Sequence, residues 1–240
     1  RFADSLSRHP GPDGVFETGD DIVGSPGVPS HGEDGVYAWA AHFGYAAQVT
    51  QRRGMPVINA AYFRSLFWEG RAEEQFLDPL TGAEVLDAGA ALESQAAGPP
   101  VNDVEMAHTG SDWAGVAARI AGARALARSP EVPAPLAAWL EGRAYPELFA
   151  EAFGSEEVTP ARIAMAIASY QRTLFSNEAP IDGVGEDVDL TAQETRGRQV
   201  FNQALCNVCH GGPLLSDDRF HYTGVTPVTD DLGRFLVTGN

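Results

Sequence analysis

The sequence contains no lysine, and all sixteen of its basic residues are arginine. Asp and Glu number 33, so the formal net charge is -17. A charge of this sign argues against nucleic acid as a partner, because binding to phosphates needs a surplus of cations. It suits a basic protein partner that is attracted electrostatically. A plainer interpretation, that the acidity only keeps the protein soluble, stays open on charge alone.

Long apolar runs are also missing, and no stretch is long enough to cross a membrane. No signal peptide is visible, since Asp4 closely follows Arg1 with no apolar segment behind it. We therefore expect a mature form or a fragment. The hydrophobic content of 44% supports a packed core, and 240 residues suffice for one large domain or two small ones.

Gly, Pro, Asp and Ser dominate residues 1–36, which are therefore predicted to be loop. A loop of this length is unusual inside a compact domain, so we expect it to wrap a cofactor or to belong to a truncated unit. Residues 36–67 are predicted to hold short helices. Residues 76–86 are predicted to form an excursion around a turn at residues 78–82. Strand signals are weak throughout.

The second half of the chain is predicted to be largely helical, at residues 112–127, 133–141, 145–153 and 160–174. Thr159 before Pro160 is a typical helix start. Residues 177–189 are polar and predict a linker, after which Thr191 and Glu194 form a capping box for the next helix. The fold class expected from these patterns is mainly α.

Cysteine is scarce, and both cysteines lie in one pentapeptide, Cys206-Asn207-Val208-Cys209-His210. This excludes a disulfide framework spread along the chain. Cys-x-x-Cys-His is the attachment site of a c-type haem: the thiols form thioethers with the porphyrin, and His210 ligates the iron. A zinc site would need further ligands, of which His221 supplies only one. A thioredoxin-like redox pair would need a preceding strand, whereas a helix is predicted here.

One c-type haem supports two kinds of function. With both axial positions of the iron filled it transfers electrons, and with one position open it activates peroxide or oxygen. The motif itself leaves both functions open.

Several sequence blocks resemble the bacterial dihaem cytochrome c peroxidase family, which includes dihaem enzymes of the methylamine-utilisation type. They occur in the family's order and span roughly residues 53–240: MPVINAAYF at 55–63, LFWEGRA at 66–72, LESQAAGP at 92–99, YPELF at 145–149, IAMAIASYQRTL at 163–174 and RGRQVF at 196–201. The resemblance implies two cytochrome c-like haem domains. We expect residues 1–176 to be the N-terminal peroxidatic domain without its own haem motif, and residues 177–240 to begin the C-terminal electron-transfer domain.

The resemblance also assigns roles to single residues. Trp68 matches the tryptophan that lies between the two haems and couples them, while Gln95 and Glu105 match the polar pair of the peroxide pocket. The chemistry of the pair is general acid–base catalysis: a carboxylate moves a proton from the inner to the outer peroxide oxygen before the O–O bond breaks. The alternatives are a surface role for Glu105 and a place in the core for Trp68.

The chain departs from the family at both ends. The first haem motif would stand just before a segment like Phe2-Ala3-Asp4, and the second axial ligand of the Cys206–His210 haem, Met or Tyr in the family, would lie beyond Asn240. We therefore expect a fragment with both domains incomplete, carrying one haem c of two and inactive alone. Arg53 stands where the family has a calcium-binding Asn, which disfavours a calcium site.

Some relatives carry a removable histidine ligand on the peroxidatic haem, and His42 is the strongest match, ahead of His31 and His9. The sequence as a whole predicts a periplasmic oxidoreductase that reduces hydrogen peroxide with electrons from a small cytochrome c or copper protein. An electron-transfer cytochrome without turnover and a dihaem oxidase acting on side chains of a partner protein are the alternatives. Monomer and homodimer both stay open.

Overall fold

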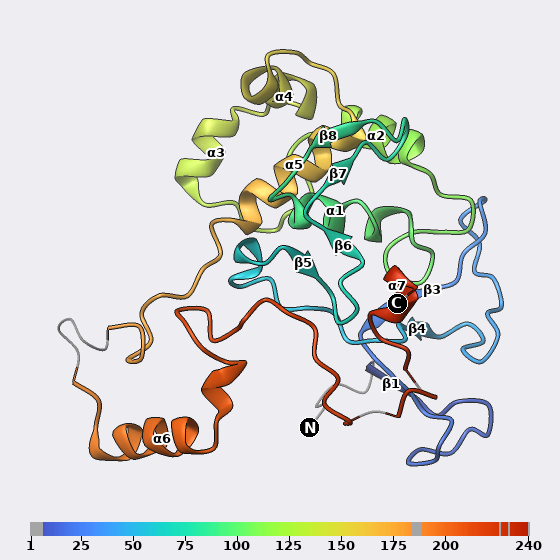
Figure 1. Ribbon diagram of the computed structural model, residues 1–240. Coiled ribbons are helices and arrows are strands. Elements are labelled where there is room, and N and C mark those ends of the chain that lie inside the picture. Colours follow the sequence, from blue (N-terminus) through green and yellow to red (C-terminus); the bar gives the residue numbers. More distant parts are fainter. Residues whose placement is uncertain (1–6, 184–188, 226, 230, 240) are drawn as a thin grey trace.

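A computed structural model describes residues 7–183, 189–225, 227–229 and 231–239 (Figure 1). The segment around Phe2-Ala3-Asp4 and part of the predicted linker, residues 184–188, lie outside the described residues. The structure is mainly helical with few short strands, 31% helix and 12% strand. No helix in the described ranges combines the length and the apolar character that a membrane crossing requires.

The centre of the molecule is the contact between helices α1 (Ala91–Ala96) and α5 (Pro160–Gln171). Alanines at this contact, including Ala90, Ala164 and Ala168, are fully buried. Small side chains allow the two helix backbones to approach closely, and Phe76 fills the adjoining space with 1% of its surface exposed. Pro160 begins α5, and the Thr159 hydroxyl accepts a hydrogen bond from the Arg162 N–H, which confirms the predicted start.

Three further helices lie between α1 and α5 in the sequence: α2 (Trp113–Ala121), α3 (Ala134–Leu140) and α4 (Tyr145–Phe153). The core between α2, α4 and α5 is built from Trp113, Val116, Phe149 and Ile163. Helix α2 is shorter than predicted, since it ends at Gly122 and the chain continues in turns. The Asp112 carboxylate caps its first turn by accepting from the Gly115 N–H at 2.7 Å.

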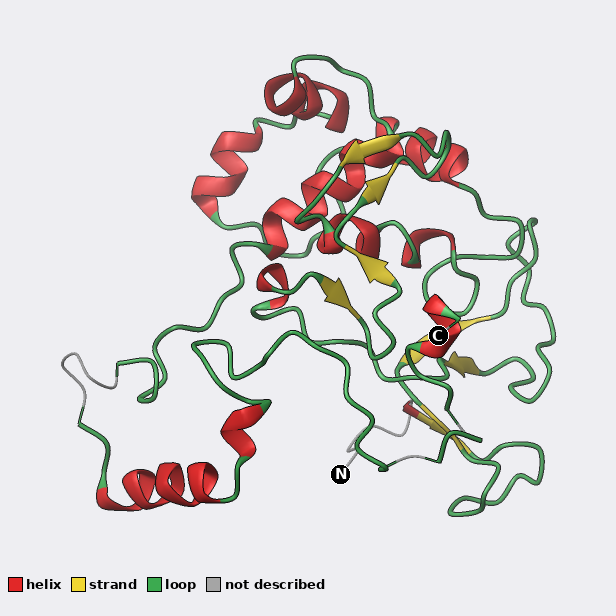
Figure 2. Cartoon of the chain, in the orientation of Figure 1, coloured by secondary structure: helices red, strands yellow, loops and turns green. Residues whose placement is uncertain are grey.

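Within the described residues, eight short strands pair in sequence order into four two-stranded antiparallel ladders (Figure 2). The pairs are β1 (Arg8–His9) with β2 (Ile22–Val23), β3 (Pro26–Pro29) with β4 (Ala47–Val49), β5 (Ser65–Leu66) with β6 (Ala72–Glu73), and β7 (Phe76–Leu77) with β8 (Glu84–Leu86). The helices predicted for residues 36–67 are therefore wrong. That range holds β4, a single 3-10 turn η2 (Ala60–Tyr62) and β5.

The predicted excursion at residues 76–86 is the β7–β8 hairpin. Its turn is closed by Asp78, whose carboxylate accepts hydrogen bonds from the backbone N–H groups of Leu80 at 2.8 Å and Thr81 at 3.0 Å. Side-chain bonding of this kind stabilises a turn where backbone pairing stops. The hairpin places Phe76 in the core while Leu77 faces outward.

The part of the chain that follows α5 is less compact. Helix α6 (Ala192–Gln203) begins at the predicted capping box of Thr191 and Glu194, which is confirmed, and none of its described residues is buried. In Figure 1 it lies apart from α1–α5, and the chain then returns to the first part of the molecule, where α7 (Phe235–Thr238) follows. Two further 3-10 turns are η3 (Pro99–Val101) and η4 (Cys206–Val208). The division into domains at residue 176 stays a prediction.

Candidate functional site

A cavity of about 810 Å³ lies between the loops of residues 22–57 and the segments around Trp68, Gln95 and Glu105. It is lined by 24 residues from at least four separate stretches of the chain. Trp68, Gln95, Glu105 and His42, which were all singled out from the sequence, are among them. The structure therefore brings these four residues to one place, and their roles stay predictions.

Gln95 is carried by α1, which a partly buried ion pair links to Arg172 at the end of α5. Glu93 is buried, with 3% of its surface exposed. Its carboxylate accepts hydrogen bonds from both terminal nitrogens of Arg172, at 2.7 Å to Oε1 and 2.9 Å to Oε2. Arg172 also donates to the Gly89 carbonyl at 3.0 Å. A bidentate contact of this kind fixes the orientation of the two side chains as well as the distance between them. The Glu93 carboxylate holds the pKa of Arg172 above its usual value by hydrogen bonding.

Glu105 sits in a turn that is held from two sides. The Asn102 carboxamide oxygen accepts from the backbone N–H of Glu105 at 3.0 Å and of Val104 at 2.9 Å. The buried Gln48 side chain donates to the carbonyls of Asp103, at 3.0 Å, and Val28, at 3.2 Å. The backbone beneath Glu105 is therefore fixed, while its half-buried side chain lines the cavity.

Trp68 is 63% exposed, so the alternative that it belongs to the core is wrong. Its neighbours explain the position: Leu66 before it and Glu69 after it are buried, and Phe67 has a left-handed φ of 73°. Gly70 follows with a φ of 70°, and a β-carbon there would meet the Phe220 ring at 2.4 Å. The tight backbone around Trp68 turns its side chain outward, toward the cavity.

Of the three histidines considered as iron ligands, only His42 lines the cavity. It is exposed and has a φ of 70° inside the small loop closed by the bridge between Ala40 and Gly44. The rings of His9 and His31 contact Phe43 and Tyr37 instead, with centroids 4.8 Å and 4.4 Å apart.

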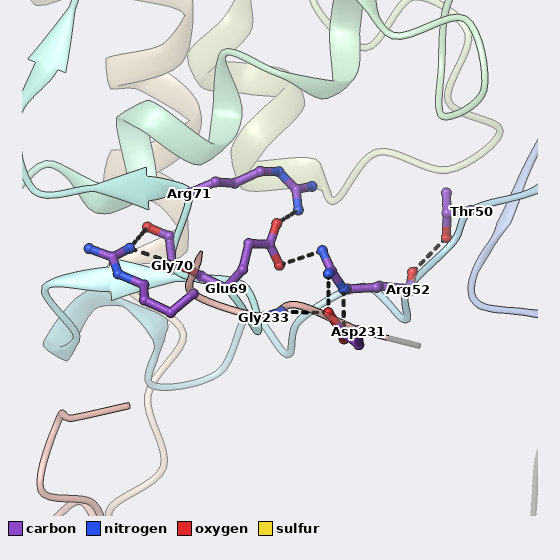
Figure 3. Close-up of polar contacts among 8 residues, drawn as sticks. Thr50, Arg52, Glu69, Gly70, Arg71, Asp231 and Gly233 are labelled. Carbon is purple, nitrogen blue, oxygen red and sulfur yellow. Dashed lines mark hydrogen bonds and ion pairs between the residues drawn. The ribbon is translucent and has the colours of Figure 1, made fainter. Parts of the chain in front are cut away.

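Positive and negative side chains alternate along one side of the cavity. They belong to Arg52, Glu69, Arg71 and Asp231, which we call the Arg52 cluster (Figure 3). Glu69 is 3% exposed and pairs with Arg71 and, at 3.0 Å, with Arg52. Arg52 also reaches Asp231 at 2.6 Å, so one guanidinium bridges two carboxylates that are far apart in the sequence. Arg52 holds the pKa of Asp231 below its ordinary value, with help from the Gly233 N–H.

The haem motif lies outside this cavity. Cys206 and Cys209 are free thiols, and η4 (Cys206–Val208) sets the local turn. His210 is exposed, and its Nδ1 lies 3.0 Å from the Leu215 carbonyl oxygen. Among the described contacts Nε2 has no partner, which leaves it available as a ligand.

Sequence reasoning missed several residues. Asp217 was not considered, yet one ligand atom each from Cys209, Asp217 and His221 lies within 4.8 Å of the others. His221 Nε2 is 2.8 Å from Asp217 and lowers the pKa of that carboxyl through a hydrogen bond. Arg52 and Asp231 were also missed, because their 179-residue separation gives no local signal.

Comparisons with known proteins agree with these features. A family model described as di-haem cytochrome c peroxidase matches residues 30–188, well over half of the chain. The methylamine utilization protein MauG of Methylophilus methylotrophus is 32% identical over 191 residues, which cover 76% of this chain and 44% of that protein. Cytochrome c peroxidase Ccp of Escherichia coli (strain K12) is 28% identical over 191 residues, covering 76% of this chain and 33% of that protein. The chain thus spans less than half the length of either relative.

A crystal structure of a MauG-like protein associated with microbial copper homeostasis has a similar fold. The TM-score is 0.51 at 22% sequence identity, with 88% of this chain and 54% of the other covered. This likeness bears on the fold alone. The match of the family model over residues 30–188 decides the family, and this chain belongs to the di-haem cytochrome c peroxidases.

Proposed function

We propose that the chain forms part of an enzyme that reduces hydrogen peroxide to water with electrons from a small redox protein, a cytochrome c or a copper protein. The main support for this proposal is that Glu105, Gln95 and Trp68 line the same cavity in a chain that belongs to this family. An electron-transfer cytochrome without turnover would not need a carboxylate and an amide at the same cavity.

The cavity suits a haem. About 810 Å³ falls inside the range of roughly 300–1,000 Å³ found for cofactor pockets. Apolar side chains such as Val49, Val57 and Phe67 line it, and Arg71 offers a cation for a haem carboxylate. When bound there, the haem would supply the iron that takes peroxide. His42 is proposed as a removable ligand of that iron.

The residues of the chain then handle the proton. Glu105, as a carboxylate, would take a proton from the inner oxygen of the peroxide and return it to the outer oxygen. The fixed backbone of residues 102–105 would keep this carboxylate in place during both transfers. Gln95 would hold the peroxide or a water molecule by hydrogen bonds from its amide.

The residues at Cys206, Cys209 and His210 suit a second, covalent haem. Both thiols are free to form thioethers, and the Leu215 carbonyl oxygen orients His210 through Nδ1. A ligating histidine commonly has its second nitrogen bound in this way, which fixes the ring and the tautomer. This haem would pass electrons toward the cavity, and Trp68 would couple the two centres.

The remaining expectations follow from this proposal. Covalent haem attachment and a small redox partner would both suit the periplasm, which is the location we propose. The net charge of -17 favours a basic electron donor.

A second function, oxidation of side chains on a partner protein, is favoured by the 32% identity to the methylamine utilization protein MauG. The identity of the second axial ligand of the Cys206–His210 haem would distinguish the two functions. We expect Met there in a peroxidase and Tyr in an oxidase of partner side chains.

The test uses the full natural protein that contains this chain, with its haems attached. Purified protein should consume hydrogen peroxide while oxidising a reduced small cytochrome c, and Glu105→Gln should lower this turnover by about 10²–10⁴-fold with both haem spectra intact. Asp103→Asn is the matched control, because Asp103 is exposed, lies two residues away and does not line the cavity. Absence of any peroxide consumption by the wild type would favour the electron-transfer alternative instead.

A further inference from the structure

We propose that Asp231 is a positioning residue for Trp68: its carboxylate accepts the indole N–H and places a negative charge beside the ring at the edge of the cavity. The proposal rests on the proposed role of Trp68 between two haems and adds a residue to it. Asp231 lies 163 residues beyond Trp68, at the end of the chain that returns to the first part of the molecule.

The position of the carboxylate is fixed by several donors. Arg52 Nη2 lies 2.6 Å from Oδ1 and Arg52 Nε lies 3.4 Å from Oδ2, while the Gly233 N–H donates to Oδ1 at 2.7 Å (Figure 3). A β-carbon built on Gly233 would lie 4.0 Å from Trp68 Nε1, so the Asp231–Gly233 turn lies against the indole nitrogen. Arg52 contributes most to the lowered pKa of Asp231, the Gly233 N–H comes next, and the Trp68 side chain adds a smaller hydrogen-bond contribution.

The contacts that hold Asp231 in place extend to residues in the first part of the chain. Arg52 also pairs with buried Glu69, the residue that follows Trp68. Arg234 strengthens the same contact by donating to the carbonyls of Glu69, at 3.1 Å, and Gly70, at 2.7 Å. The returning segment is therefore held against the backbone that directly follows Trp68.

Trp68 needs such a restraint because the core does not supply one. Its side chain is 63% exposed, whereas Trp113, whose indole N–H donates to the Ala97 carbonyl at 3.0 Å, is 5% exposed. An indole that carries electrons must keep one orientation, since electron exchange depends on the relative geometry of donor and acceptor. The bond to Asp231 would provide that orientation.

The charge of Asp231 adds a second effect. In the proposed function, Trp68 would pass one electron to a haem held in the cavity and take one from a haem held by Cys206, Cys209 and His210, so the ring would end unchanged. The N–H proton stays in the bond to Asp231 throughout, and no other reactant is needed. A carboxylate stabilises the transient positive charge on the ring, whereas a neutral amide in the same place accepts the bond without that charge.

The experiment compares Asp231→Asn and Asp231→Glu in the full natural protein with its haems attached. Ultraviolet resonance Raman spectra report the strength of the Trp68 N–H hydrogen bond, with Trp68→Phe used to identify the Trp68 bands. We expect a weaker N–H bond and electron exchange between the haems slowed by about tenfold or more in Asp231→Asn. Asp231→Glu, which keeps the charge, should recover most of the rate.

Glu73→Gln is the matched control, because it removes an ion pair of the same returning segment that does not involve Asp231. It should leave both the Trp68 bands and the exchange rate unchanged. Unaltered Trp68 bands in folded Asp231→Asn would overturn the proposal, and so would an equal loss of rate in Glu73→Gln.

A third outcome separates this proposal from the proposed function. If Trp68→Phe leaves electron exchange at the wild-type rate, Trp68 does not couple the haems and that part of the proposed function fails. The Raman bands would still decide whether Asp231 holds the indole. Should Asp231→Asn fail to fold, Asp231→Glu provides the same test, since a longer carboxylate must shift the N–H band if Asp231 is the partner.

Discussion

Replacing Arg172 with methionine should destabilise the protein through Glu93. Methionine keeps most of the length of the arginine stem but removes both bonds to the carboxylate, which is 4% exposed. Breaking a fully buried pair costs about 3–5 kcal/mol, and breaking an exposed one about 0.2–1 kcal/mol. Because the Arg172 side chain is 37% exposed, the loss should lie between these limits, at about 2–3 kcal/mol.

The assay is urea unfolding followed by circular dichroism, with the free energy of unfolding compared at equal slope. Arg64→Met is the control: its pair with Glu74 is largely exposed, and its loss should stay within about 1 kcal/mol. The double variant Arg172→Met with Glu93→Leu should recover most of the stability, because no unpaired buried charge remains. A loss in Arg172→Met no greater than in Arg64→Met would refute the reasoning.

Two further predictions concern pH and haem attachment. The pKa of Asp231 is lowered in the folded protein, so its stabilising contribution is fully present above its unfolded value of about 3.9 and is lost as the pH falls through the lower folded value. Hydrogen exchange should therefore show residues 231–239 loosening in acid before α5 does, and uniform loosening would contradict this. Haem staining after denaturing electrophoresis should persist in the wild-type chain made with haem-attachment machinery, and Cys206→Ser with Cys209→Ser should remove the stain from this chain. A colourless wild-type band would rule out covalent haem.

The local parts of the fold could be predicted from the sequence. The starts of α5 and α6 follow from Thr159-Pro160 and from the capping box of Thr191 and Glu194, because these signals act within one helical turn. The ladders in the first half could not be predicted, since strands of two to four residues are too short to show an alternating pattern.

The candidate site likewise contains some residues that could be predicted from the sequence and others that could not. Resemblance to the family singled out Trp68, Gln95 and Glu105, and the fold brings them to one cavity. Arg52 and Asp231 could not be predicted, because an ion pair across 179 residues depends on how the end of the chain returns. Asp217 near Cys209 and His221 was missed for a related reason: the loop after the haem motif has no periodic pattern.

The central claim is that peroxide is reduced at the cavity, with Glu105 moving the proton. The most direct measurement is the peroxide turnover number of Glu105→Gln in the full natural protein, beside Asp103→Asn. We expect a fall of about 10²–10⁴-fold for Glu105→Gln, the contribution usual for general acid–base catalysis, with haem content and spectra unchanged and with Asp103→Asn at the wild-type rate. Wild-type turnover in Glu105→Gln would contradict it.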